Sequence, residues 1–207
     1  LTHTGPKQLI PIANKPMSQY ALEDLRKAGI KCIAIILGDI APEKVIEYYG
    51  NGSRFGVEIT YVRQDEPKGI AHAVGLAKEF AGDEDFVVYL GDNLLRDGIT
   101  ELVEGFRTSG AAAQIALSRV RNPEAFGVAE LDNQGKVVKL IEKPKVPPSD
   151  LALVGVYMFQ KRIFDAIDAL KPSWRGELEI TEAIQRLIDM GLTVHSHVVS
   201  GWWKDTG

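Results

Sequence analysis

The stretch FVVYLGDNLL, residues 86–95, changes character halfway along. Five apolar or aromatic residues, Phe86 to Leu90, suit a buried strand, and Gly91, Asp92 and Asn93 follow at once. These three residue types are the commonest in tight turns, so a plain turn is one interpretation. A ligand site is the other, because open α/β sheets bind ligands beyond the carboxyl ends of their strands. The fold around this segment decides between them.

Apolar runs alternate with helical patterns along the first 120 residues. Runs suited to buried strands lie at 32–37, 57–62, 86–90 and 111–118. Apolar residues recur at helical spacing within 17–28, 42–49, 70–80 and 99–106. Short, almost continuously hydrophobic strands separated by amphipathic helices are what a parallel sheet covered on both faces requires. The pattern therefore predicts a doubly wound, mostly parallel α/β sheet.

The alternation of strand and helix patterns ends after residue 120. The segment 126–143, which reads FGVAEL, the turn DNQG and then VVKLIEK, is typical of an antiparallel hairpin inserted in the sheet. The rest of the chain contains a proline-rich loop at 143–150, an apolar run at 151–159, helical patterns through 163–167 and 180–188, and a strand at 193–199. We expect one domain over residues 1–207.

Composition and charge exclude several classes of protein. The 207 residues are 45% hydrophobic and 25% charged, as in ordinary soluble domains, and no apolar run approaches the roughly 20 residues of a membrane span. The net charge of −4 lacks the broad excess of Lys and Arg that nucleic-acid binding requires. The only cysteine, Cys32, lies in the apolar run CIAIIL, where we expect a buried, inert thiol in a reducing cytoplasm.

Four further segments contain residue types that bind phosphates, sugars or cations. They are KQLIPIANKPM at 7–17, EKP at 142–144, WRGELEIT at 174–181 and WWKDTG at 202–207. Lysines on a proline-fixed loop supply point charges for phosphate, and carboxylates accept hydrogen bonds from hydroxyl groups. Each segment also has an ordinary interpretation: a solvated lysine loop, a solvent-facing ion pair, acidic residues at a helix start, and an aspartate in a turn.

The order of these motifs along the chain is specific. They occur as K-Q-L-I-P-I-x-N-K-P-M, Q-x4-G-x-A-H-A, L-G-D-N, F-G-V, E-K-P, G-V-Y, R-G-E-L-E-I-T and W-x-D-T-G. In this order the chain resembles the sugar-nucleotide pyrophosphorylases over essentially all 207 residues, most closely the glucose-1-phosphate thymidylyltransferase branch. The forms S-D-L-A-L-V-G-V-Y-M-F and G-W-W-K-D-T-G are similar to the longer branch, whose additional C-terminal β-helical segment is absent here.

The resemblance implies a Rossmann-like, GT-A-like nucleotidyltransferase fold and a particular reaction. Glucose 1-phosphate attacks the α-phosphorus of dTTP in line, dTDP-glucose forms and pyrophosphate leaves. Such a transfer depends on positioning and charge neutralisation. By resemblance, Asp92 and Asp205 bind Mg²⁺, an ion that typically takes one or two carboxylates together with substrate phosphates. The implied partners are dTTP or UTP and glucose 1-phosphate, in a cytoplasmic homo-oligomer that binds neither nucleic acid nor membrane.

The resemblance also assigns site residues. The expected catalytic residues are Lys7, Asp92 and Asp205. The expected nucleotide-binding residues are Lys7, Gln8, Gln64, Gly69 and Asp92, with Gln64 and Gly69 reading the pyrimidine. The expected sugar-phosphate-binding residues are Asn93, Gly127, Glu142, Lys143, Gly155, Val156, Arg175 and Glu177. Residues 1–120 would form a nucleotide-binding half, and residues 121–207 a sugar-binding half.

One part of the family pattern is not in this sequence. The N-terminal strand and its loop G-G-x-G-T-R-L-x-P, whose backbone amides cradle the triphosphate, would precede Leu1. Without that strand, ladder groups and core would be exposed, so we expect these residues to exist in a longer polypeptide. A polypeptide that began at Leu1 is predicted to be an inactive and unstable fragment.

The residues leave other functions open. Uridylyl transfer differs only in the base and the 2′-position. A catalytically silent nucleotide-sugar-binding subunit would keep the fold, although it has little need for two metal carboxylates. A nicotinamide dehydrogenase is disfavoured, because the strand-helix turns lack G-x-G-x-x-G. His195 and His197 share one strand face, yet the sequence supplies no third ligand for a zinc site.

Overall fold

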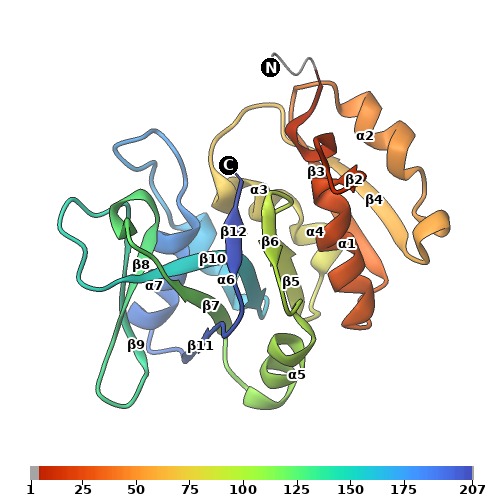
Figure 1. The fold of residues 1–207 in the computed structure, drawn as a ribbon. Helices are drawn as coiled ribbons and strands as arrows, with labels where there is room; N and C mark the ends of the chain where they lie inside the picture. Colours follow the sequence, from red (N-terminus) through yellow and green to blue (C-terminus); the bar gives the residue numbers. More distant parts are fainter. Residues whose placement is uncertain (1–4, 207) are drawn as a thin grey trace.

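The strand that leads to Asp92 lies beside a long, buried strand. The structure, a computed structural model, describes residues 5–206 (Figure 1). Its main sheet has six strands: β5 (Phe86–Tyr89), β7 (Ala113–Arg119), β8 (Gly127–Leu131), β9 (Val137–Glu142), β10 (Leu151–Phe159) and β11 (Val194–Val198). Every residue of β10 is buried, because β10 has neighbours on both sides.

β10 organises this sheet. β7 pairs along one side of it, whereas on the other side β8 pairs at Ala152 and β5 pairs from Val156 to Phe159. β8 and β5 therefore diverge from β10 around Gly155, where the register with β7 is also irregular. A place where neighbouring strands diverge leaves room for a ligand between their ends.

The strand directions agree with the predicted α/β class. β10 runs antiparallel to β5, β7 and β8, and β11 runs parallel to β7. β5, β7, β8 and β11 consequently share one direction, whereas β9 and β10 run the other way. The hairpin expected at 126–143 is confirmed as the antiparallel pair β8 and β9. The expected division into two halves at residue 120 stays a prediction.

Helices cover both faces of the sheet. The helices are α1 (Met17–Lys27), α2 (Pro42–Tyr49), α3 (Ile70–Leu76), α4 (Lys78–Ala81), α5 (Thr100–Ser109), α6 (Arg162–Asp168) and α7 (Ile180–Asp189), with short 3-10 turns η1 (Lys7–Leu9), η2 (Ser53–Phe55) and η3 (Pro123–Ala125). Leu153 and Phe159 of β10 belong to the core with α6 and α7, whereas Val154 and Val156 belong to the core with α5. This alternation is that of a strand buried on both faces.

The N-terminal part forms a separate ladder. β3 (Cys32–Leu37) pairs in parallel with β4 (Glu58–Arg63), and α1 and α2 share its core. Among residues 5–206 no strand joins β3 to β5, so β5 has a neighbour on one side only. Two expectations are therefore wrong: Phe86–Tyr89 is half-buried rather than buried, and Cys32 is exposed at the start of β3.

One predicted helix is divided. The pattern at 70–80 forms α3 and α4 instead of one helix, and Ala77 is the cap between them. Gly75, which has low helix propensity, lies in the last turn of α3. In the part of the chain that the structure describes, no helix is long and apolar enough to cross a membrane.

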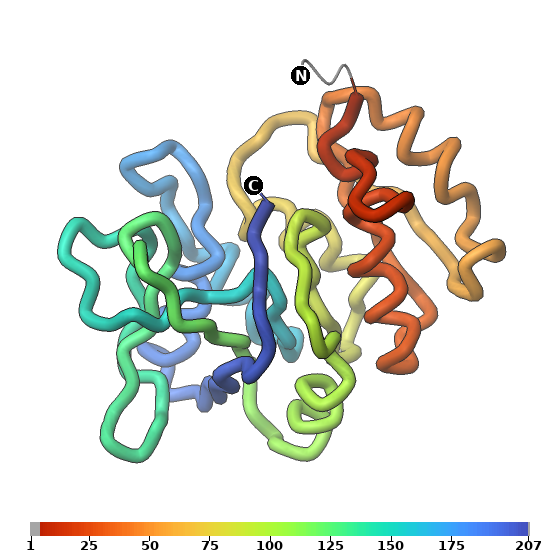
Figure 2. The backbone as a smooth tube through the Cα atoms, viewed as in Figure 1, coloured from red at the N-terminus to blue at the C-terminus, as the bar shows by residue number. Residues whose placement is uncertain are grey.

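Two pairs of short strands lie outside the main sheet. β1 (Pro11–Ile12) and β2 (Lys15–Pro16) form a small hairpin, and β6 (Asn93–Leu95) pairs with β12 (Trp203–Asp205). Figure 2 shows the dark blue C-terminal segment running alongside the green segment that follows β5. The sequence motifs L-G-D-N and W-x-D-T-G thus meet in space, although Gly207 of the second motif lies outside the described residues.

Candidate functional site

The two predicted metal ligands lie at the ends of paired strands. In the antiparallel register of β6 and β12, Asp205 lies opposite Asn93, the residue after Asp92. Thr206 reinforces this junction, because its backbone N–H and its hydroxyl both donate to the Asp92 carbonyl oxygen, at 3.0 and 2.8 Å. The backbones of two aspartates that are far apart in sequence are therefore held close together.

Lys7 lies directly against Asp92. Its Nζ is 3.0 Å from Oδ2 of Asp92, and both side chains are partly exposed, at 42% and 31%. The other oxygen, Oδ1, accepts a hydrogen bond from Nδ2 of Asn93 at 3.0 Å. An ion pair this accessible contributes little to stability, so it leaves both groups available to a charged ligand.

Asn93 joins three strands beneath this pair. Its side chain is 1% exposed, and its Oδ1 accepts hydrogen bonds from the Gly155 N–H at 2.9 Å and from Nε1 of Trp203 at 2.6 Å. Its Nδ2 donates to Asp92. A buried amide with three partners is held in one orientation, because breaking any of these bonds leaves an unsatisfied polar group. Asn93 thereby fixes β6, β10 and β12 relative to one another.

A cavity of about 200 Å³ opens beside this junction, where β5 and β8 diverge from β10. This volume is below the usual range for a drug-sized ligand and suits a small polar one. The residues predicted to bind the sugar phosphate that line it are Asn93, Gly127, Glu142, Lys143, Gly155, Arg175 and Glu177, and Asp205 lines it too. Val156 does not line it, because its side chain is fully buried in the core with α5.

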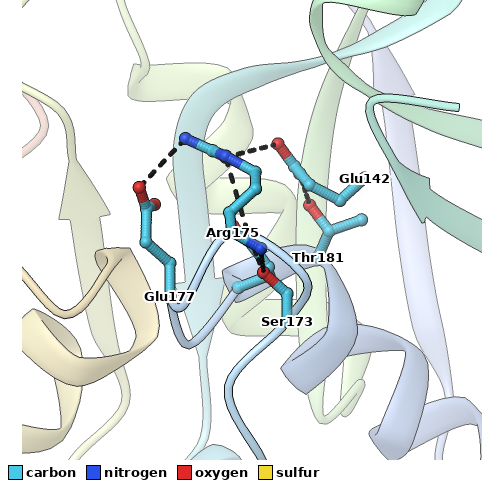
Figure 3. A network of polar contacts seen from close by, with 6 residues as sticks. Glu142, Ser173, Arg175, Glu177 and Thr181 are labelled. Carbon is cyan, nitrogen blue, oxygen red and sulfur yellow. Dashed lines mark hydrogen bonds and ion pairs between the residues drawn. The ribbon is translucent and has the colours of Figure 1, made fainter.

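Arg175 is at the centre of an acidic network on one wall of the cavity (Figure 3). Its guanidinium lies 3.0 Å from Glu177, 3.4 Å from Glu179 and 3.7 Å from Glu142. One cation thus faces three carboxylates, which leaves a local negative charge and several acceptor oxygens. Such a wall can bind the hydroxyl groups of a sugar.

Local turns explain why these side chains converge. Gly176, with φ of +77°, allows a tight turn in which the Ser173 N–H donates to the Glu177 carbonyl at 2.8 Å. The Ser173 hydroxyl donates to Glu179 at 2.8 Å, just before α7 begins at Ile180. Burial raises the pKa of the Glu179 carboxyl, and the hydrogen bond from Ser173 opposes this shift.

The hairpin β8–β9 lines the cavity next to this network. Thr181 donates to Oε2 of Glu142 at 2.6 Å, which holds that carboxylate toward the cavity. A Cβ on Gly127 would lie 2.8 Å from Oγ1 of Thr181, so a glycine is needed for this close approach. Lys143, an exposed cation beside Glu142, has φ of +40°. Non-glycine residues in this conformation are strained and cluster at functional sites.

Gln64 and Gly69 lie outside the cavity but border it. They belong to the segment between β4 and α3, which is tied to the sugar-side loop by two backbone bonds. The Leu178 N–H donates to the Lys68 carbonyl at 2.7 Å, and the Ala71 N–H donates to the Leu178 carbonyl at 3.1 Å. The cavity and the predicted base-reading segment are therefore neighbours.

Gln8 lies close to the turn that carries Asp92, since a Cβ on Gly91 would come within 4.0 Å of its Cγ.

Three residues that sequence reasoning did not assign also take part in the site: Ser173, Thr181 and Tyr157. Thr181 is the last residue of the motif R-G-E-L-E-I-T, and this position was the only sequence feature that could have indicated its part in the site. Burial, with the nearby carboxylates of Glu142, Asp205 and Asp92, raises the pKa of the Tyr157 hydroxyl.

The carboxylates of Asp92 and Asp205 are suitable ligands for a hard divalent cation that also binds water and phosphate. Within residues 5–206 no group of three or more His, Cys, Asp or Glu side chains is arranged to hold a metal ion, His195 and His197 included. A cation at Asp92 and Asp205 would take its remaining ligands from water and phosphate, as Mg²⁺ typically does. A lysine, two aspartates and an acid-lined cavity at the ends of α/β strands are typical of enzymes that act on phosphorylated substrates.

The comparisons with known proteins identify the family. The family model described as Nucleotidyl transferase matches residues 1–207, and the chain belongs to this family. Over 207 residues the chain is 58% identical to "Low-salt glycan biosynthesis nucleotidyltransferase Agl11" of Haloferax volcanii. Over 208 residues it is 54% identical to "Glucose-1-phosphate thymidylyltransferase" of Streptomyces antibioticus. Both alignments include the whole chain but only 58% of the relative's length.

Solved structures agree with this placement. A protein from Bacillus anthracis in complex with sucrose, described as a glucose-1-phosphate thymidylyltransferase, is 40% identical with a TM-score of 0.91, over 99% of this chain and 82% of that one. A UDP-glucose pyrophosphorylase complexed with UDP-glucose is 26% identical with a TM-score of 0.85, over 97% of this chain and 84% of that one. The predicted family and α/β fold class are confirmed.

Proposed function

We propose that the protein transfers a thymidylyl group from dTTP to glucose 1-phosphate, giving dTDP-glucose and pyrophosphate with Mg²⁺. The observation that carries this proposal is the convergence of Lys7, Asp92 and Asp205 beside an acid-lined cavity. Relatives named glucose-1-phosphate thymidylyltransferase, at 54% and 51% identity, support it. The cytoplasmic location and the homo-oligomeric state stay predictions.

The cavity suits the sugar phosphate. Glu142 and Glu177 are placed to accept hydrogen bonds from sugar hydroxyls, and Arg175 orients both carboxylates. Gly127 allows the ring to approach the backbone of β8 closely. Lys143, exposed at the mouth, supplies a positive charge for the sugar's phosphate. The phosphate oxygen would then face the junction of Asp92 and Asp205.

The chemistry is an in-line displacement. A phosphate oxygen of the sugar forms a bond to the α-phosphorus of dTTP, the bond from that phosphorus to the bridging oxygen breaks, and pyrophosphate leaves with the electron pair. A bound Mg²⁺ supplies neutralisation of the phosphate oxygens. Lys7 leaves Asp92 and neutralises the transferring phosphate, while Asn93 keeps the two aspartates in place.

Two alternatives remain testable with the same assay. "UTP--glucose-1-phosphate uridylyltransferase AglF" of Haloferax volcanii is 37% identical to this chain, so uridylyl transfer is the nearest alternative. The protein is incubated with Mg²⁺, glucose 1-phosphate and each of dTTP, UTP, GTP, CTP and ATP, and pyrophosphate is measured. We expect the fastest release with dTTP. Faster release with UTP would favour uridylyl transfer, and no release with any nucleotide would favour a non-catalytic binding subunit.

Glu142→Gln is expected to raise the KM for glucose 1-phosphate by about 10- to 100-fold, with the KM for dTTP nearly unchanged. Gln keeps an acceptor for Thr181 but loses the charge, and hydrogen bonds to charged groups contribute about 1.5–3 kcal/mol. The matched control is Glu130→Gln, an exposed position on the same hairpin, which should leave both KM values unchanged. A Glu142 variant whose KM for glucose 1-phosphate equals that of the wild-type protein would show that the sugar does not bind at Glu142.

A further inference from the structure

The segment between β4 and α3 holds the Gln64 side chain through two contacts at a single atom. Its amide nitrogen Nε2 lies 3.3 Å from the Gly69 carbonyl oxygen and 2.9 Å from Nδ1 of His72. His72 is half-buried in the first turn of α3. By resemblance to the family Gln64 and Gly69 read the base, and His72 has no assigned role.

The Gly69 carbonyl determines the direction of both hydrogen bonds. A carbonyl oxygen can only accept, so the amide nitrogen of Gln64, and not its oxygen, must face Gly69. The same nitrogen then donates its second hydrogen to His72, whose Nδ1 must be unprotonated and whose ring proton must be on Nε2. Both donors of the Gln64 amide are used within the protein. Among residues 5–206 its oxygen Oε1 has no hydrogen-bond partner, so it can accept a hydrogen bond from a ligand.

The segment is anchored so that this arrangement persists. Gly69 has φ of +98°, and a Cβ there would lie 2.5 Å from the Leu178 carbonyl oxygen, so Gly69 packs directly on the sugar-side loop. The backbone bonds from Leu178 to Lys68 and from Ala71 to Leu178 hold both ends of the turn. Gln64 itself is fixed by its own N–H, which donates to the Leu37 carbonyl at 2.8 Å.

An acceptor distinguishes the pyrimidines. Thymine and uracil carry a hydrogen on ring nitrogen N3, whereas N3 of cytosine has a lone pair and no hydrogen. A lone Oε1 can therefore accept the N3 hydrogen of the first two bases, whereas at the same position cytosine presents the N3 lone pair and has a donor only on its neighbouring N4 amino group. We propose that His72 is a positioning residue, which holds the Gln64 amide so that only its acceptor reaches the base and cytosine is rejected. This inference rests on the proposed function, because it deepens the reading of the base by Gln64.

Two substitutions of His72 separate this role from simple packing. His72→Leu removes the acceptor, which frees one hydrogen of the Gln64 amide and lets it donate to a base. His72→Asn keeps an acceptor, because its Oδ1 is bonded to Cγ just as Nδ1 is. Binding of dTTP and of dCTP is measured by calorimetry with Mg²⁺ for the wild-type protein and both variants, and thermal unfolding verifies that each variant is folded.

We expect the wild-type protein to bind dTTP at least about 100-fold more tightly than dCTP, because a site built to bind a ring N–H rejects a base that lacks it. In His72→Leu this ratio should fall by about 10-fold or more, and in His72→Asn it should stay close to the wild-type ratio. An unchanged ratio in His72→Leu, or an equal fall in both variants, would overturn the inference.

The same measurements distinguish failure of the inference from failure of the proposed function. Selective binding that follows these expectations, without pyrophosphate release, would overturn thymidylyl transfer and leave the role of His72 standing. Pyrophosphate release with an unchanged selectivity in His72→Leu would do the reverse. No binding of either nucleotide to the wild-type protein would overturn both.

Discussion

Asp92→Asn is expected to lower kcat for pyrophosphate release from dTTP and glucose 1-phosphate by at least about a thousandfold. The substitution keeps the shape of the side chain and removes one of two carboxylates available to the cation. Loss of several kcal/mol of charge stabilisation at the transferring phosphate corresponds to this factor, because each 1.4 kcal/mol or so is tenfold in rate. Steady-state assays over a range of Mg²⁺ concentrations measure it, and the Mg²⁺ requirement should rise as well.

The stability of this variant separates the two interpretations of the Gly-Asp-Asn turn. The Asp92 side chain is 31% exposed and its ion pair with Lys7 is accessible to solvent, so the midpoint of thermal unfolding should stay close to the wild-type value. Asp97→Asn is the matched control, because Asp97 is an exposed aspartate on the same segment and, within residues 5–206, it pairs only with Arg96. If the Asp92 variant kept its activity and lost much of its stability, the interpretation of Gly-Asp-Asn as a plain turn would be favoured.

The periodicity of the sequence predicted most elements of the fold, since apolar spacing records which faces are buried. It did not predict their partners. The run 151–159 reads as a strand in any α/β protein, but its pairing with β5, β7 and β8 depends on long-range contacts that have no local signal. Cys32 shows the same limit, because a position in an apolar run does not reveal that its strand end is uncovered.

For the site, the sequence predicted which segments meet but not how their side chains are oriented. Motif order placed Asp92 and Asp205 in one site, and the register of β6 and β12 brings their backbone positions close together. Their shared role as metal ligands stays a prediction. The orientation of side chains was beyond such reasoning. The hydrogen bond from Thr181 to Glu142 and the one between Gln64 and His72 arise only when helix starts are placed beside strand ends. The individual binding roles assigned by resemblance stay predictions.

Gly155→Ala is expected to lower the stability of the fold by about 3 kcal/mol, because its methyl group has no space. A Cβ at Gly155 would lie 2.6 Å from Cγ of Asn93 and 2.7 Å from both Oδ1 and Nδ2. Asn93 cannot move aside easily, since it is 1% exposed and bonded to Asp92, Trp203 and Gly155 itself. Overpacking in a core costs about 1–3 kcal/mol, and a displaced buried amide adds about 1–3 kcal/mol.

The midpoint of thermal unfolding should therefore fall by about 6–12 °C in Gly155→Ala. Asn93 donates a hydrogen bond to Asp92, so a displaced Asn93 should also shift Asp92 and lower kcat. If the strain were confined to Gly155 and Asn93, stability alone would change. Gly38→Ala is the matched control: a Cβ there meets no atom within 4 Å, and its midpoint should stay near the wild-type value. A Gly155 variant with unchanged stability and activity would show that the Asn93 amide is free to move, and that it does not hold the two aspartates together.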